Sequence, residues 1–174
     1  MKNFKTEAIV LSSQNFFEKD KLITVFSKEL GKCRILVKSA NNQKYKQIGK
    51  IFPTNHIQTE LYRGKSFWLL SQCGITTFFP NLRTDLEKIK LAFYFFDILL
   101  KASEFEIKHE NLFELLLTSL KLIEGSTADL ASIKAYFQEE FLKSEGLLGE
   151  DELVTSELFK EKFLIYSGKA TIKL

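Results

Sequence analysis

The stretch LITVFSKELGKCRILVKS, residues 22–39, contains two short runs of β-branched and apolar residues on either side of a glycine turn. The runs Leu22–Ser27 and Cys33–Ser39 are typical of β-strands, and Leu30-Gly31-Lys32 is short enough to join them tightly. Three similar runs surround this pair: Thr6–Leu11, Ile57–Tyr62 and Phe67–Gln72. Five short strands within about 75 residues predict a small closed β-barrel.

Two connections of this predicted barrel have distinct compositions. Arg63-Gly64-Lys65 joins the fourth and fifth strands, and a positive φ is expected at its glycine. Residues 40–54 (ANNQKYKQIGKIFPT) lie between the third and fourth strands, carry Lys44, Lys46 and Lys50, and have no steady period. This composition predicts a long basic loop.

The second half of the sequence has the period of helices. Pro80 marks the boundary, because proline ends strand pairing and is tolerated where a helix begins. Thr84 and Glu87 have the spacing of a capping box. Apolar residues then recur at helical spacing over Leu86–Leu100, Leu112–Glu124, Leu130–Phe141 and a short stretch around Thr155–Leu164, before a strand-like or frayed Ile165–Leu174. The sequence therefore predicts two domains, residues 1–79 and 80–174.

Charge is divided unequally between these halves. Residues 1–80 contain 13 Lys and Arg against 5 Asp and Glu, whereas residues 81–174 contain 12 against 17. A basic half attracts polyanions, of which nucleic acid is the usual one. The third strand illustrates the pattern, since Ile35 and Val37 alternate with Arg34 and Lys38, which places cations on one face.

The basic residues of the first half fall at strand ends, in turns or on one exposed strand face. In a five-stranded barrel, the loops between strands one and two and between strands four and five flank the binding groove. We expect nucleic-acid contacts from Lys19, Lys21, Lys32, Arg34, Lys38, Lys44, Lys46, Arg63 and Lys65. Scattered lysines could also serve only to solvate the barrel. Aromatic rings suited to stacking on bases are Tyr45, Tyr62, Phe67 and Trp68, although each is equally suited to the core.

Patterns typical of enzymes, metal sites and membrane proteins are missing from the sequence. No glycine-rich phosphate loop is present. His56 and His109 are expected to be solvated surface residues, and Cys33 and Cys73 to be reduced, half-buried thiols without zinc-type spacing. The acidic run at residues 150–152 is expected to be a solvated loop or the start of a helix. Because no run approaches the roughly 18 apolar residues of a membrane span, and no signal peptide is evident, a cytosolic protein is expected.

Several segments together resemble the RecO family of bacterial recombinational-repair mediators. They are KTEAIVL (residues 5–11), Glu18–Ala40, Thr59–Gln72, Phe78–Ile89 and His109–Glu124, and the similarity extends to about Leu148. The resemblance implies an α+β, two-domain chain: an N-terminal five-stranded OB-fold β-barrel followed by an all-α helical domain. It also implies a protein that is not an enzyme, needs no cofactor and works at the bacterial nucleoid.

The family's activity, carried over by resemblance, is binding of single- and double-stranded DNA and annealing of complementary strands. Its members contact RecR and the acidic C-terminal tail of the single-stranded-DNA-binding protein, and help to load the RecA recombinase. A pure protein–protein adaptor, whose barrel binds no nucleic acid productively, is the alternative. For the acidic tail we expect an apolar slot fringed by one or two of Lys88, Lys90, Lys101 and Lys121.

Two departures from the family pattern stand out. Family members usually continue after the third strand as an arginine-rich Lys-Gly-Ala-Arg segment, whereas this chain reads Lys38-Ser39-Ala40-Asn41-Asn42. The change weakens bidentate phosphate binding there, and Lys44 and Lys46 replace it only in part. Many members also carry a four-cysteine zinc module, but no cysteine follows Cys73, so we predict no zinc.

Overall fold

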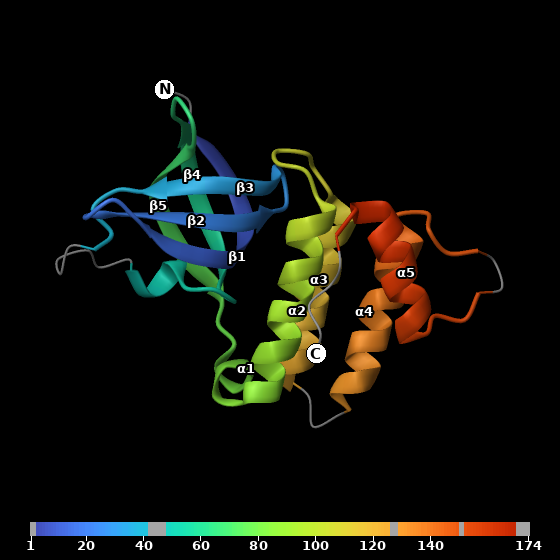
Figure 1. Cartoon of the computed structure of the whole chain (residues 1–174). Helices are drawn as coiled ribbons and strands as arrows, with labels where there is room; N and C mark the ends of the chain where they lie inside the picture. The colour runs from blue at the N-terminus through green and yellow to red at the C-terminus, as the bar shows by residue number, and fades with distance from the viewer. Residues whose placement is uncertain (1–2, 42–47, 126–128, 150–151, 170–174) are drawn as a thin grey trace. The chain divides into compact units, whose positions relative to one another are not determined.

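The computed structural model describes residues 3–41, 48–125, 129–149 and 152–169 (Figure 1). The chain divides into two compact units. The first contains residues 1–78 together with residues 104–110, and the second contains residues 79–103 and 111–174. The first unit is thus completed by a short segment that the chain supplies from between two helices of the second.

The first unit is a closed five-stranded barrel with the strand order β1-β2-β3-β5-β4. Its strands are β1 (Phe4–Phe16), β2 (Asp20–Ser27), β3 (Gly31–Val37), β4 (His56–Arg63) and β5 (Trp68–Thr77). All neighbours pair antiparallel except β3 and β5, which pair in parallel. This is the arrangement of an OB-fold, so the predicted barrel is confirmed.

Strand β1 is long because it belongs to both sides of the barrel. Its first residues, Phe4–Ile9, pair with β4, and its register with β2 shifts between Val10 and Ser12 before pairing continues to Phe16. An irregularity of this kind bends a strand and increases its twist, which lets one strand close a small barrel.

The barrel interior is filled by alternate residues of each strand. Ile35 and Val37 are buried while Arg34 and Lys38 are exposed, which confirms the alternation predicted for β3. Neither Cys33 nor Cys73 is part of a disulfide, and both are buried in this core, more fully than predicted. Burial raises the pKa of the Cys33 thiol to about 12, so this cysteine is a neutral core residue at physiological pH.

The two glycine turns differ in why they need glycine. Gly31 has a φ of +63°, and a Cβ there would lie 1.8 Å from the carbonyl oxygen of Ile107. Gly64 does not have the positive φ that we predicted. Its N–H donates to the Phe67 carbonyl at 3.0 Å, and a Cβ would lie 2.6 Å from that oxygen. Close backbone approach therefore replaces left-handed conformation as the reason for Gly64.

The second unit is helical throughout its described secondary structure. Its elements are α1 (Pro80–Thr84), α2 (Leu86–Ala102), α3 (Glu110–Gly125), α4 (Leu130–Ser144) and α5 (Ser156–Ser167). Within the described residues, no helix combines the length and apolar character that crossing a bilayer requires. A short 3-10 helix, η1 (Ile48–Ile51), belongs instead to the barrel unit.

Three details of the helices bear on the predictions. The apolar face predicted for α3 is confirmed, because Leu112, Leu116 and Leu120 are buried. The predicted capping box at the start of α2 is wrong: the Asp85 side chain accepts the N–H bonds that cap this helix. The strand-like tail is wrong as far as Ser167, because α5 continues to that residue.

Aromatic side chains form the core of the helical unit. Phe95 of α2 stacks on Phe137 of α4 with ring centroids 4.0 Å apart, and Phe141 contacts Phe159 and Phe163 of α5. Such pairs contribute about 0.5–1.5 kcal/mol each beyond the area they bury. Most of the phenylalanines of this half therefore stabilise the fold.

Candidate nucleic-acid interface

A shallow groove opens on the barrel where strand β3 ends. Its lining residues come from the end of β1, from the end of β3 and the residue after it, from the turn between β4 and β5, and from the start of β5: Phe16, Leu36, Lys38, Gly64, Lys65, Ser66, Phe67 and Leu69. Its volume is about 320 Å³. We call it the Lys38–Lys65 groove. The sequence predicted a binding groove flanked by the β1–β2 and β4–β5 connections. The lining of this groove includes the β4–β5 turn but, from the β1 side, only Phe16, the last residue of β1.

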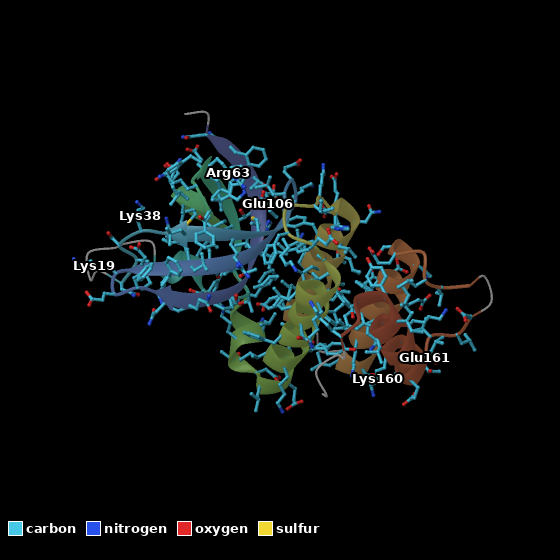
Figure 2. All side chains as sticks on the ribbon, turned by 45° about the horizontal axis from the view of Figure 1, so that its top comes forward. Lys19, Lys38, Arg63, Glu106, Lys160 and Glu161 are labelled. Carbon is cyan, nitrogen blue, oxygen red and sulfur yellow. The ribbon has the colours of Figure 1, made fainter. Side chains whose placement is uncertain are left out.

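The β1–β2 turn is tied to the chain that follows β3. The Ser39 N–H donates to Asp20 Oδ1 at 2.8 Å, and the Asn41 N–H donates to the Lys19 carbonyl at 3.0 Å. These bonds hold Lys38 and Lys19 at the same end of the barrel, where Figure 2 shows both side chains extending outward. Both lysines are exposed, as is Lys65. Three cations therefore border this end of the barrel and can reach an anionic ligand.

Lys21 is less available than these three. It is half-buried at the start of β2, and its Nζ donates to Asn15 Oδ1 at 3.0 Å. The bond leaves its charge intact, because asparagine is neutral. Lys21 therefore adds positive potential to this end of the barrel while its ammonium group is held close to β1.

Aromatic rings meet at the same place. The Phe16 ring lies edge-to-face against Phe17, with centroids 4.6 Å apart, and against Phe67, at 5.6 Å. Sequence reasoning selected Phe67 but missed Phe16 and Phe17. The signal was a pair of phenylalanines directly before the polar turn Glu18-Lys19-Asp20, where core residues are not expected.

The other predicted rings have different surroundings. Trp68 is half-buried, with its ring 5.7 Å from the Phe4 ring and 5.1 Å from the Arg63 guanidinium. Tyr62 is half-buried in β4. Tyr45, Lys44 and Lys46 lie outside the described residues, so their predicted roles remain predictions.

Three of the predicted cations contact residues 104–110, which we call the 104–110 segment. The Lys32 ammonium and the Arg34 guanidinium lie 4.4 and 4.6 Å from the centre of the Phe105 ring. Arg63 Nη1 donates to Glu106 Oε1 at 2.6 Å. Figure 2 shows this pair away from Lys19 and Lys38. A nucleic acid would have to compete with the segment for these three side chains.

Backbone contacts fix the 104–110 segment on β3. The Glu106 N–H donates to the Lys32 carbonyl at 2.8 Å, and Lys32 and Phe105 form a parallel bridge. Lys108 Nζ also lies 3.2 Å from Glu29 Oε2. The absence of a side chain at Gly31 permits this close approach. The β2–β3 turn and the segment therefore form one docked structure.

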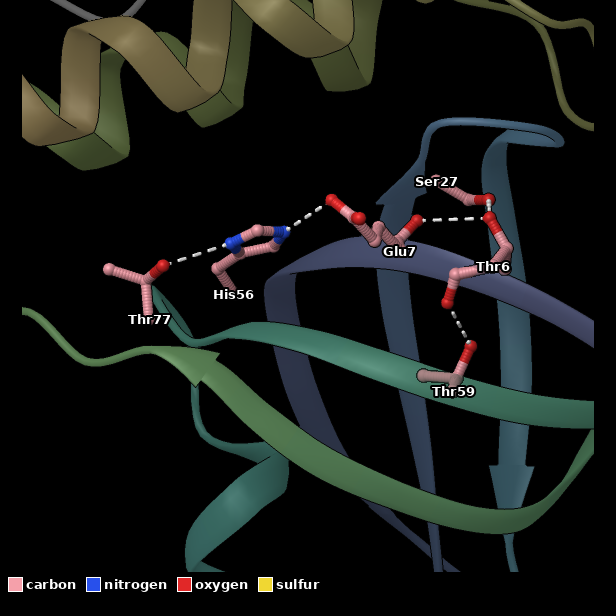
Figure 3. A network of polar contacts seen from close by, with 6 residues as sticks. All are labelled: Thr6, Glu7, Ser27, His56, Thr59 and Thr77. Atoms are coloured by element: carbon pink, nitrogen blue, oxygen red, sulfur yellow. Dashed lines mark hydrogen bonds and ion pairs between the residues drawn. The ribbon is translucent and has the colours of Figure 1, made fainter.

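His56 is a buried structural residue, and the prediction of a solvated histidine is wrong. Its side chain lies between Glu7 Oε2, at 3.1 Å from Nε2, and Thr77 Oγ1, at 3.2 Å from Nδ1 (Figure 3). Thr77 is its direct partner on β5, and Glu7 is two residues from its partner Ile9 on β1. The burial of His56 depends on pairing between strands whose residues are far apart in sequence, so local sequence could not predict it.

Among the described residues, no three His, Cys, Asp or Glu side chains are grouped as metal ligands would be. His109 is half-buried beside the start of α3. The structure thus offers neither histidine an evident partner set for metal binding within the part of the chain that it describes.

The four lysines of which one or two were predicted to line a partner slot are spread over the helical unit. Lys90 pairs with Glu87 at 2.8 Å and Lys101 with Asp97 at 2.5 Å, while Lys88 is half-buried on α2 and Lys121 is exposed on α3. Lys88 and Lys101 lie about 20 Å apart along the α2 axis, at 1.5 Å per residue. One short slot therefore cannot include all four.

A groove of about 410 Å³ does lie between α3 and α4. Its lining includes Leu115, Tyr136, Glu114 and Glu140, together with Lys143, which pairs with Glu139 and Glu140. The residues that line it do not include the four predicted lysines. Two carboxylates on its walls make this groove a poor match for an acidic peptide.

A closed β1-β2-β3-β5-β4 barrel with a cation-bordered groove, continued in the chain by a helical unit, defines an OB-fold protein with an appended α-helical domain. Comparison with known proteins shows which family this chain resembles. Residues 1–79 match the family model described as "Recombination protein O N terminal".

Curated relatives agree over most of the chain. The DNA repair protein RecO of Clostridium novyi is 31% identical over 82% of this chain and 56% of its own length. The RecO protein of Pelotomaculum thermopropionicum is 32% identical over 75% of this chain and 51% of its own length. The RecO protein of Alkaliphilus metalliredigens is 27% identical over 82% of this chain and 58% of its own length. The chain is similar to RecO proteins over most of its length, which confirms the predicted resemblance, and the matches span a little over half the length of these relatives.

Proposed function

We propose that this chain is a DNA repair and recombination mediator that binds single- and double-stranded DNA and anneals complementary strands. The observation that carries the proposal is the Lys38–Lys65 groove, in which two exposed lysines border an apolar floor with Phe16 and Phe67. Cations reduce the repulsion between two phosphate backbones, and base pairing then drives annealing. No covalent step is required, so the protein is proposed not to be an enzyme.

The division of labour follows the two halves of the sequence. Residues 1–79 are proposed to bind DNA and residues 80–174 to contact protein partners. The proposed partners are RecR and the acidic C-terminal tail of the single-stranded-DNA-binding protein, as the family resemblance of the sequence implies. With them, the chain would help to load RecA onto coated DNA at the bacterial nucleoid in the cytoplasm. For the tail, Lys121, which is exposed on α3, is a better candidate than Lys90 and Lys101, whose ammonium groups already pair with carboxylates.

The strongest test is the salt dependence of binding to an unstructured oligonucleotide. If Lys19, Lys21, Lys38 and Lys65 each neutralise one phosphate, log K should fall against log salt with a slope of about −3. Contributions from Lys44 and Lys46 would steepen it to roughly −4. The experiment is a fluorescence-anisotropy titration of labelled oligo-dT at several salt concentrations.

A protein–protein adaptor is the second candidate function. It is favoured by the 104–110 segment, which already engages Lys32, Arg34 and Arg63 and so reduces the cations available to DNA. An adaptor would show no oligonucleotide binding at low salt, or binding without salt dependence. Either result would eliminate the mediator proposal in favour of the adaptor.

A further inference from the structure

Phe17 is unusual in two independent ways. Its side chain is 81% exposed, although burying a ring of this size is favourable. Its φ is +56°, a left-handed conformation that glycine or asparagine adopts far more readily than a bulky residue. The exposed ring adds little buried area to the barrel. A short hairpin connection can use a positive φ, but phenylalanine is a strained choice for it, so the residue type is a reason to look for a ligand.

The ring of Phe17 is the outer member of a short aromatic series. Phe17 contacts Phe16, and Phe16 contacts Phe67 on the β4–β5 turn. Phe16 and Phe67 also line the Lys38–Lys65 groove. The series therefore leads from the β1–β2 turn into the groove, and its outer end at Phe17 is exposed.

The charges around this series indicate what it can bind. Lys19 lies two residues beyond Phe17, and Lys38 and Lys65 border the groove. Aromatic faces alternating with exposed cations are complementary to a chain of flat rings on an anionic backbone, which is single-stranded nucleic acid. In a duplex the base faces are stacked on one another, so a duplex offers Phe17 phosphates but no ring face.

We propose that Phe17 stacks on an unpaired base where the strand enters the Lys38–Lys65 groove, and that this contact makes the groove prefer single strands to duplexes. The inference rests on the proposed function and names its preferred substrate. The cations attract both forms of DNA, whereas the Phe17 ring gains a partner only from the unpaired one.

The test compares Phe17→Ala with the unchanged protein on three probes of equal length: oligo-dT, an abasic oligonucleotide and a duplex. Stacking on one base is worth about 1–3 kcal/mol, so affinity for oligo-dT should fall about tenfold. Affinity for the abasic strand and the duplex should change less than about twofold, and the salt slope should not change. Phe52→Ala is the matched control, because Phe52 is 50% exposed and does not line the groove.

Phe17→Gly keeps the test independent of folding. Glycine removes the ring and also relieves the positive φ, so this variant should unfold at the same temperature as the unchanged protein or higher. It should nevertheless lose oligo-dT affinity as Phe17→Ala does. Equal losses on oligo-dT and on the abasic strand, or no loss on oligo-dT, would overturn the stacking proposal while leaving the proposed function intact. Failure of the unchanged protein to bind any probe would overturn both.

Discussion

Arg34 in β3 and Lys38, directly after β3, are both exposed and an even number of residues apart, yet their side chains have different surroundings. Lys38 is exposed at the edge of a groove with Lys65 and two phenylalanines. Arg34 lies against Phe105 of the 104–110 segment, close to Lys32 and to the Arg63–Glu106 ion pair. The contrast teaches that a count of cations on a surface overstates what a ligand can use.

We call the region of the Lys38–Lys65 groove the open end, and the region where Lys32, Arg34 and Arg63 contact the 104–110 segment the covered end. The two also differ in their aromatic neighbours. At the open end, the rings of Phe16, Phe17 and Phe67 contact one another and border exposed cations. At the covered end, Phe105 and Trp68 lie against Lys32, Arg34 and Arg63. Aromatic and cationic side chains therefore form a candidate ligand surface at the open end, whereas at the covered end they contact one another.

Removing both lysines of the groove should have the largest effect on binding. In the double variant Lys38→Ala, Lys65→Ala we expect oligo-dT affinity to fall about a hundredfold at low salt, since each charge-assisted phosphate contact is worth roughly 1.5 kcal/mol. The salt slope should become shallower by about 1.4, because two fewer counterions are released. Anisotropy titrations over a salt series would measure both changes.

Lys160→Ala supplies the matched control for this variant. Lys160 is an exposed lysine on α5 of the helical unit, so its removal lowers the net charge without touching the barrel. The control removes one charge and the double variant removes two. A loss of about tenfold in the control, half of the double variant's loss in free energy, would therefore mean that net charge alone decides affinity, and the contrast between the two ends of β3 would have no meaning for binding.

Cys33 lies between Lys32 and Arg34 in β3, with its side chain in the barrel core. Its titration should make the free energy of unfolding depend on pH. Burial, and to a smaller extent Glu106, raises its pKa from 9.0 to about 12, while Arg63 opposes the shift. Between these two pH values the unfolded chain has lost a proton that the folded chain retains, so the free energy of unfolding falls as the pH rises. The thiol should cost the fold about 1.4 kcal/mol between pH 8 and pH 10.

Urea denaturation of the unchanged protein and of Cys33→Ala at both pH values would measure this difference. Other groups that titrate in the range are common to the two proteins and cancel in the comparison. The variant should lose less stability than the unchanged protein on going to pH 10. Identical losses would show that the Cys33 thiolate forms equally easily in the folded and unfolded states.

The smallest effects are expected at the covered end. Arg63→Ala should change oligo-dT affinity less than about twofold, because Arg63 already pairs with Glu106 on the exposed surface. Glu106→Gln should raise affinity about two- to threefold at low salt, since it releases the guanidinium and removes a negative charge. Its cost in stability should be below about 1 kcal/mol, as for other exposed ion pairs.

Anisotropy titrations of Arg63→Ala and Glu106→Gln would measure these changes. Lys65→Ala is the variant to compare with Arg63→Ala, since the two residues belong to the same β4–β5 connection. If Arg63→Ala weakens binding as strongly as Lys65→Ala does, DNA displaces the 104–110 segment when it binds. The covered cations would then belong to the binding surface, as the sequence first suggested for Lys32, Arg34 and Arg63.

The sequence by itself determined the five strands, the inward orientation of Ile35 and Val37, the buried face of α3 and the family resemblance. The strands and the buried faces depend on local periodicity, because alternate residues of a strand and every third or fourth residue of a helix share a face wherever the element lies. They could be read without knowing how distant segments meet.

Only the tertiary structure decided which cations contact the 104–110 segment, that His56 is buried and that Phe17 is exposed. Arg63 and Glu106 are 43 residues apart in sequence, and His56 and Glu7 are 49 apart. Partners at such separations depend on barrel closure and on the docking of a segment that the chain supplies from between two helices. Local composition gave the same expectation for Arg34 as for Lys38, because charge and alternation carry no information about what a distant segment will cover.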